Sequence, residues 1–450
     1  MGSNCVAKTA WLPDLTGRDP VKYRAIAAAL AADIAAGRLQ PGDRLPPQRD
    51  LAWRLGVNVA TVTEAYREAA RQGLVGGEVG RGTYVRAEPC GPELFGVRGA
   101  AGAIDLAVNL PAIDGQDRSF AETLGQMLAE GLPDDALGYA SGPAVARGRL
   151  AAAAWLAGRG WAVAADRVTL AAGAQAGLAA TLSILTRPGD AVLVEALTFP
   201  GMLAAARQFG LRLVPVALDA EGVVAADLLR AARASGARVA VLTPCLQNPT
   251  GALMGAGRQA EVAAALVRAG LTLVEDDVYG ALCDMPPLSA RIPDRAVLVS
   301  SLSKAVAPGL RFGFVAAPPA LVPALGAEGH ATTWQIAPVM LALAARWIGD
   351  GTAARRVRWQ IREIAARQRL AARVLGVAPG IAPHLWLARD DGDGFAAAAA
   401  GRGVIVAAAS AFAAGRGAPD GVRICLASAR DRRQLARAFD RMMTSAAGLS

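Results

Sequence analysis

The chain has 450 residues, of which 53% are apolar and 19% are charged. At about 150 residues per domain this length predicts two or three domains, and the composition is typical of packed globular protein rather than of disordered chain. No stretch reaches the roughly 18 uninterrupted apolar residues of a membrane span, and the first residues lack the apolar core of a signal peptide. We therefore expect a cytoplasmic protein without membrane contact.

The five cysteines and two histidines limit the chemistry of the chain. The cysteines are scattered, odd in number and never spaced as CxxC, which argues against a disulfide framework and against a structural zinc site. His330 and His384 are too few for a histidine-based metal centre, so no metal site is expected. The net charge of +9 permits a polyanionic partner without establishing one.

Lysine usage singles out one residue. Of 47 basic residues only Lys8, Lys22 and Lys304 are lysines. A lysine amine forms an imine with an aldehyde, whereas a guanidinium does not. Lys304 is therefore a candidate for covalent chemistry, although composition alone is equally compatible with an ordinary surface lysine.

After an N-terminal extension over residues 1–19, residues 20–86 predict three helices followed by a short hairpin. Two short helices joined by a Gly-containing turn can place the second helix in the major groove of DNA. By itself this pattern is equally compatible with a plain three-helix module. We expect helices over 23–36, 48–55 and 59–72, and strands over 74–78 and 83–86.

This segment also carries side chains suited to DNA. Asn58, Thr61 and Thr63 at the start of the third helix can reach phosphates or base edges, and three arginines, Arg49, Arg67 and Arg81, attract phosphates. The stretch GRLQPGDRLPPQRDLAWRLGVNVATVTEAYREAARQGLVGGEVGRGTYV closely resembles the winged helix of the GntR family. The resemblance implies double-stranded DNA as partner, contacted by Arg49, Asn58, Thr61, Thr63, Arg81 and Gly82. The chain departs from many relatives at Val59, where they have an arginine.

Residues 87–103, rich in Gly, Ala and Pro, predict a linker. Over 104–446, apolar strands alternate with Ala-rich helices, the pattern of a doubly wound α/β domain. From about residue 350 a long Arg-rich helix, short strands and a final helix predict a smaller C-terminal α+β subdomain. In the α/β part we expect strands over 167–170, 191–195, 212–217, 239–243, 272–275, 297–300 and 312–316.

Lys304 follows one of these strands at its C-terminal end, where α/β domains bind ligands. An aldehyde cofactor with a phosphate tail needs an amine, phosphate donors, an anion beside its ring nitrogen and a flat group against its ring. The phosphate candidates are the side chains of Ser301, Ser303 and Arg311 and the backbone amides of Ala174 and Gln175 at a helix N-terminus.

The remaining requirements also have candidates. The run 275–279 offers a carboxylate and the phenol of Tyr279, the Asn-Pro-Thr-Gly turn presents the amide of Asn248, and Phe199 can stack on a ring. Each of these has a simpler structural explanation when taken singly: a solvated strand end, a turn or a core residue. Their occurrence together and in this order favours a cofactor site.

Residues 104–446 as a whole resemble the fold-type I aminotransferases of class I and II. The resemblance implies pyridoxal 5'-phosphate (PLP) as cofactor and a Schiff base at Lys304. It also implies that Asp276 faces the pyridinium nitrogen, that Asn248 and Tyr279 bind the ring oxygen, and that Arg311 with Ser301 holds the phosphate. Phe199 stands where many relatives have tyrosine, which keeps the stacking and loses a hydrogen bond.

Two further residues follow from the same resemblance. Tyr139 would reach a phosphate, in the family usually that of the neighbouring subunit, so a homodimer is expected. Arg423 matches the arginine that binds the α-carboxylate of the substrate.

A GntR-type winged helix joined to such a domain resembles the MocR-like regulators. The resemblance implies a DNA-binding regulator that senses an amino acid, an amine or PLP itself through imine chemistry at Lys304. A working aminotransferase is the alternative, because Lys304 can serve as general base and Arg423 can orient an amino acid. A third reading is a DNA-binding scaffold indifferent to the cofactor. The sequence leaves open whether transamination turns over.

Overall fold

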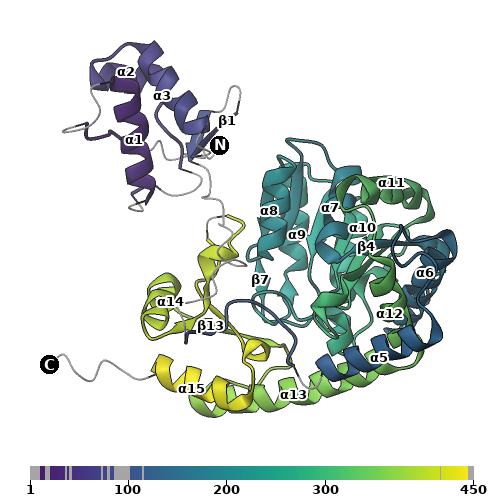
Figure 1. The fold of residues 1–450 in the computed structure, drawn as a ribbon. Coiled ribbons are helices and arrows are strands. Elements are labelled where there is room, and N and C mark those ends of the chain that lie inside the picture. Colours follow the sequence, from purple (N-terminus) through teal and green to yellow (C-terminus); the bar gives the residue numbers. More distant parts are fainter. Residues whose placement is uncertain are drawn as a thin grey trace. The chain divides into compact units, whose positions relative to one another are not determined.

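The computed structural model describes residues 11–15, 21–35, 38–39, 43–71, 74–78, 82–85, 102–113, 116–415 and 417–443. The chain divides into two compact units, Met1–Glu93 and Leu94–Ser450 (Figure 1). Arg81 and most of the expected linker and N-terminal extension lie outside the described residues.

The first unit is a three-helix bundle with a hairpin. Its core is formed by residues such as Ile26, Leu30, Leu51, Val62 and Tyr66, which are almost fully buried. The predicted element boundaries differ from the observed ones by no more than one residue. The elements are α1 (Lys22–Ala35), α2 (Gln48–Leu55), α3 (Val59–Arg71) and the antiparallel strands β1 (Val75–Glu78) and β2 (Gly82–Val85).

The turn between α2 and α3 follows from two residues. Gly56, at φ 61°, ends α2 in the left-handed region that favours glycine. Asn58 then caps α3, because its side-chain oxygen accepts a hydrogen bond of 2.9 Å from the backbone N–H of Ala60. The turn therefore sets the direction in which α3 leaves α2.

A seven-stranded sheet forms the centre of the second unit, in the order β4-β12-β11-β10-β9-β5-β6. β12 is antiparallel to both of its neighbours and all other neighbouring pairs are parallel. This arrangement confirms the predicted α/β class. The strands are β4 (Val168–Ala172), β5 (Ala191–Glu195), β6 (Arg212–Val216), β9 (Val239–Leu242), β10 (Thr272–Asp276), β11 (Ala296–Ser301) and β12 (Phe312–Ala316), and a small hairpin is formed by β7 (Leu218–Asp219) and β8 (Gly222–Val223).

Helices cover both faces of this sheet, as the alternation along β5 shows. Val192 and Val194 pack in one core with α7 and α8, whereas Leu193 packs in another with α9 and α10. Successive strand residues point to opposite faces, so the inner strands of the sheet, such as β9, β11 and β12, are buried on both sides. The helices are α5 (Gln116–Glu130), α6 (Gly142–Ala157), α7 (Ala174–Leu185), α8 (Pro200–Gln208), α9 (Ala225–Ser235), α10 (Ala256–Arg268), α11 (Val322–Thr332) and α12 (Pro338–Gly349).

The C-terminal part has its own antiparallel sheet, ordered β13-β16-β15, with α13 lying beside α15 (Figure 1). The short strand β3 (Ile104–Asp105) pairs in parallel with β14 and thereby joins this part. The sequence did not predict that contribution, because a two-residue strand has no periodicity. The elements are α13 (Thr352–Leu375), β13 (His384–Ala388), α14 (Gly392–Gly401), β14 (Val404–Ile405), β15 (Ala407–Ala408), β16 (Gly421–Cys425) and α15 (Arg432–Met443).

Within the described ranges, the helices are all too short or too polar to cross a bilayer.

Candidate functional site

A cavity of about 450 Å³ lies where β4, β5, β9, β10 and β11 end. All the residues predicted for the cofactor and substrate line it, with the exception of Tyr139. They come from segments spread over 250 residues of chain, and the shared edge of the sheet brings them together. These residues are Ala174, Gln175, Phe199, Asn248, Asp276, Tyr279, Ser301, Ser303, Lys304, Arg311 and Arg423.

Lys304 is half-buried in this cavity, and its Nζ donates a hydrogen bond of 2.7 Å to the backbone oxygen of Asn109. Burial lowers the pKa of the Lys304 amine to about 8, and the positive charge of Arg423 adds to the effect. A substantial fraction of this amine is therefore neutral near physiological pH. The neutral amine is the form that attacks an aldehyde.

Among three consecutive acidic residues only Asp276 lines the cavity. Glu275 accepts hydrogen bonds from the backbone N–H groups of Leu288 and Ser289, and Asp277 pairs with Arg159. Burial raises the pKa of the Asp276 carboxyl to about 6, and the nearby Lys304 charge opposes the rise. A protonated ring nitrogen beside Asp276 would favour its charged form.

The N-terminus of α7 provides an anion-binding cradle. Gly173 precedes it at φ 94° and ψ 165°, a conformation essentially confined to glycine, and no side chain caps the helix. The Arg311 guanidinium donates a hydrogen bond of 2.8 Å to the backbone oxygen of Ala172, and a Cβ atom at position 173 would overlap with it. Backbone N–H groups and a guanidinium thus lie together, an arrangement suited to binding an anion such as a phosphate.

Arg423 is a buried cation on β16, only 3% exposed. Its guanidinium donates to the side-chain oxygen of Asn248 at 2.7 Å and to the backbone oxygen of Ala107, and it lies 4.7 Å from the ring centre of Phe412. Its Nε atom has no hydrogen-bond partner. A buried guanidinium held by neutral acceptors retains a positive charge that a ligand carboxylate can balance.

Two residues at the site were not singled out as ligand contacts by the sequence. Asn109 lines the cavity, and its side-chain nitrogen donates a hydrogen bond of 2.7 Å to the Tyr279 hydroxyl. Nδ1 of His384, a residue that the sequence analysis named only in arguing against a metal centre, lies 3.3 Å from the same nitrogen. Asn109 belongs to an irregular segment without a motif, so no sequence signal marked it.

Tyr139 lies apart from the cavity of its own chain. Its side chain is 72% exposed, and its ring centre lies 5.4 Å from that of Trp334.

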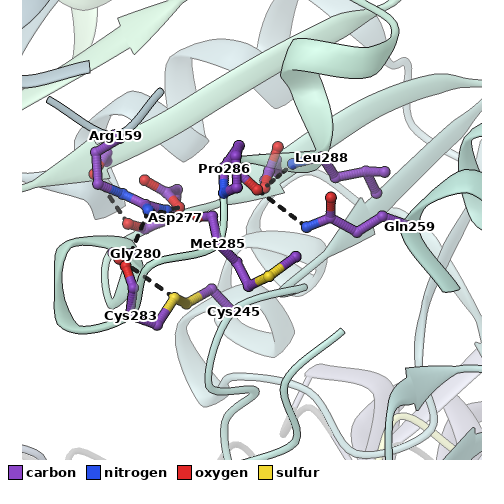
Figure 2. Close-up of a disulfide and its surroundings, with 11 residues drawn as sticks. Arg159, Cys245, Gln259, Asp277, Gly280, Cys283, Met285, Pro286 and Leu288 are labelled. Atoms are coloured by element: carbon purple, nitrogen blue, oxygen red, sulfur yellow. Dashed lines mark hydrogen bonds and ion pairs between the residues drawn. A yellow bond between two sulfur atoms is a disulfide. The ribbon is translucent and has the colours of Figure 1, made fainter. Parts of the chain in front are cut away.

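A disulfide joins Cys245 and Cys283 (Figure 2). The sequence argued against a disulfide framework and did not predict this single disulfide, because the fold brings together two residues 38 positions apart. Beside the disulfide, Arg159 donates to the backbone oxygen of Met285 at 2.6 Å and pairs with Asp277 at 2.8 Å. The disulfide thus links the segment that follows Tyr279 to Cys245, and Arg159, just beyond α6, binds the same segment through the backbone oxygen of Met285.

In the first unit, the residues predicted to bind DNA lie around the start of α3. Arg49 and Asn58 are exposed, and Thr61 is half-buried. The Thr63 hydroxyl donates to the side-chain oxygen of Gln48 at 2.7 Å, so it already has a partner inside the domain. Two predicted residues lie elsewhere: Arg67 is exposed and pairs with Glu64 at 2.6 Å, and Gly82 is the first residue of β2.

Both units of the chain are similar to known protein families. Residues 22–85 match the family of bacterial regulatory proteins called gntR, and residues 101–442 match aminotransferase class I and II. The chain is 30% identical over 408 residues to the vitamin B6 salvage pathway transcriptional repressor PtsJ of Salmonella typhimurium, covering 88% of this chain and 92% of PtsJ. It is 26% identical over 383 residues to the probable rhizopine catabolism regulatory protein MocR of Rhizobium meliloti, covering 78% of this chain and 76% of MocR.

Among solved structures, the α-aminoadipate aminotransferase LysN of Thermus thermophilus matches with a TM-score of 0.70 at 23% identity, covering 78% of this chain and 92% of LysN. The second unit is thus a fold-type I aminotransferase domain, preceded by a winged helix of the GntR type. The chain belongs to the MocR-like family of HTH-type transcriptional regulators.

Proposed function

We propose that this regulator binds PLP at Lys304 and that an amino acid, an amine or PLP itself acts there as the effector that alters DNA binding. One observation carries the proposal. A single cavity collects an amine, an acid, an anion cradle, an aromatic ring and a buried guanidinium, each suited to a different part of PLP or of an amino acid.

The residues fit the cofactor part by part. The cradle formed by α7 and Arg311, together with Ser301, suits the phosphate, and Asp276 suits the ring nitrogen. Phe199 lies half-buried in the cavity wall, where its ring can stack on the pyridine. The side-chain amide of Asn248 and the phenol of Tyr279 suit the ring oxygen.

PLP supplies an aldehyde carbon at which one amine can replace another. Lys304 contributes the amine that holds the cofactor in the absence of effector, and Arg423 orients the carboxylate of an incoming amino acid. If an effector amine took the place of Lys304 on the cofactor, the released lysine amine could make the hydrogen bond to the backbone oxygen of Asn109 that this structure shows. Such a local change can bias an equilibrium between two arrangements of the regulator.

We infer further that the regulator acts as a homodimer in the cytoplasm, where its DNA is found. Tyr139 is the observation in support, because it is exposed and does not line the cavity of its own chain. Several other large apolar side chains of the second unit are also exposed. They include Leu128, Leu137, Leu150 and Trp334.

An active aminotransferase is the second candidate function. The lowered pKa of Lys304 and the uncompensated charge of Arg423 are the features that favour it, since a neutral lysine can move the α-proton of an amino acid. Conversion of the bound cofactor to its amine form by an amino acid, followed by turnover with a 2-oxo acid, would support this candidate. Ligand binding without turnover would support a sensor.

The covalent step has a direct test, because the chain has only three lysines. PLP-loaded protein is treated with borohydride, which fixes an imine as a stable amine, and its peptides are mapped by mass spectrometry. We expect the pyridoxyl group on Lys304, its loss in Lys304→Ala and its retention in the control Lys22→Ala. A protein that stays colourless in excess PLP would refute the proposal.

A further inference from the structure

We propose that Asn109 and His384 are positioning residues that make the Tyr279 hydroxyl donate its proton into the cavity, toward the ring oxygen of the cofactor. The identity of that acceptor rests on the proposed function, whereas the arrangement of the three side chains does not. Neither Asn109 nor His384 belongs to the set that the sequence motifs predicted for cofactor binding.

Asn109 connects two functional groups of the site. It lies between β3 and α5 and is only 6% exposed. Its backbone oxygen accepts the hydrogen bond of Lys304, while its side-chain nitrogen donates to the Tyr279 hydroxyl at 2.7 Å and faces Nδ1 of His384 at 3.3 Å. Both protons of the amide nitrogen therefore have an acceptor.

The neighbours of His384 define which of its nitrogens carries the proton. The ring is 1% exposed on β13, and its Nε2 lies 3.0 Å from the backbone oxygen of Gln247. A carbonyl oxygen only accepts hydrogen bonds, so Nε2 carries the proton. Burial and the Arg423 charge lower the pKa of His384 to about 3, which keeps the ring neutral. Nδ1 therefore bears a lone pair and requires a donor.

That requirement orients the amide of Asn109. With the opposite orientation, the amide oxygen would face the lone pair of His384 Nδ1, and the two acceptors would repel. In the observed orientation the side-chain oxygen of Asn109 is buried without a hydrogen-bond partner. The hydrogen bonds of this side chain are therefore all on its nitrogen side, toward Tyr279 and His384.

The consequence concerns Tyr279. Its hydroxyl accepts from Asn109, so its own proton is available for a different acceptor, and the residue lines the cavity. Burial raises the pKa of Tyr279 above its usual value, so the hydroxyl keeps its proton. A hydroxyl that accepts a hydrogen bond is also a stronger donor. The arrangement therefore favours a negatively charged oxygen on the ligand.

The test measures the absorption band of PLP-loaded protein as a function of pH. The quantity compared between variants is the midpoint, the pH at which half of the change in this band has occurred. Asn109→Leu keeps the size of the side chain and removes the donor, so we expect the midpoint to rise by about half to one pH unit, the equivalent of one net hydrogen bond. The other groups that face Lys304 and Tyr279, which are Asp276, Arg311, Arg423 and Cys425, stay unchanged.

His384→Phe tests the action through Asn109. It keeps a ring beside Tyr279, 5.6 Å away between centres, and removes the acceptor, so the amide is free to turn its oxygen toward the phenol. We expect the midpoint to rise as well. In the double variant the His384 substitution should add nothing, because it acts only through the amide. Gln259→Leu removes a buried amide elsewhere and should leave the midpoint unchanged.

The outcomes separate the two proposals. If wild-type protein takes up no PLP, the proposed function is contradicted. The arrangement of Asn109, His384 and Tyr279 is then tested by a second measurement. Normal uptake with unchanged midpoints in both Asn109→Leu and His384→Phe overturns the positioning role.

The second measurement needs no cofactor and no variant of the site. The chain has two histidines, so ¹⁵N-histidine labelling with His330→Gln for assignment isolates the His384 signals. We expect a neutral ring protonated on Nε2 in protein without PLP. A charged ring at neutral pH, or a proton on Nδ1, would overturn the arrangement.

Discussion

Replacing Gly173 by alanine should weaken the binding of PLP as well as strain the backbone, and a control glycine elsewhere in the chain separates the two effects. At φ 94° and ψ 165° the backbone adopts a conformation that costs a residue with a Cβ about 1–3 kcal/mol. The new Cβ would also occupy the place of the Arg311 guanidinium, which must then leave the cradle. The variant therefore loses both stability and the charged contact to the phosphate.

The loss of the charged contact can be estimated. A hydrogen bond to a charged group contributes about 1.5–3 kcal/mol, and about 1.4 kcal/mol corresponds to a factor of ten in affinity. Gly173→Ala should therefore weaken PLP binding about 10- to 100-fold. The dissociation constant is obtained by titrating cofactor-free protein with PLP and following its absorption.

Gly189→Ala is the matched control. Gly189 has nearly the same φ, 93°, but no atom lies near its missing Cβ and it does not line the cavity. Both variants should lower the thermal unfolding temperature of the cofactor-free protein, and only Gly173→Ala should lose PLP affinity. Equal PLP affinities for the two variants would refute the reasoning.

Three further predictions follow from the site. The rate of PLP uptake should rise with pH through about 8, the lowered pKa of Lys304, because deprotonation yields the reactive amine; a rate that rises only near the pKa of an exposed lysine would contradict this. Asp277→Asn leaves the buried charge of Arg159 unbalanced and should lower the free energy of unfolding in urea by about 3 kcal/mol; unaltered stability would argue against the ion pair. Peptide mapping without reductant should recover the Cys245 and Cys283 peptides linked, and separate peptides would contradict the disulfide.

The regular elements were predictable because burial imposes a pattern on their residues. β5 was predicted at its observed bounds, since an apolar run ending in Glu195 is what a strand buried on both faces requires. β4 extends two residues beyond its prediction to Ala172, where consecutive alanines give no periodic signal. The location of Lys304 and Asp276 was also predictable, because Asp276 ends β10 and Lys304 follows β11, at the same edge of the sheet.

Contacts between distant segments were not predictable from the sequence. Asn109 meets Tyr279 and His384 across 170 and 275 residues, and Cys245 meets Cys283 across 38. Each contact arises from tertiary packing between segments far apart in the chain, and neither periodicity nor a local motif indicates which distant residue will be the partner. Tyr139 shows the opposite case, since its resemblance to a family residue was visible although it does not line its own cavity.

The central claim is that the binding of PLP or an amino acid at Lys304 controls the affinity of the regulator for DNA. It is tested most directly by fluorescence anisotropy on the DNA upstream of the regulator's own gene, with wild-type protein and Lys304→Ala, each with and without PLP and amino acids. We predict that the affinity of the wild-type protein for this DNA changes with PLP or with an amino acid, and that Lys304→Ala does not respond. An identical wild-type affinity under all these conditions would contradict the account.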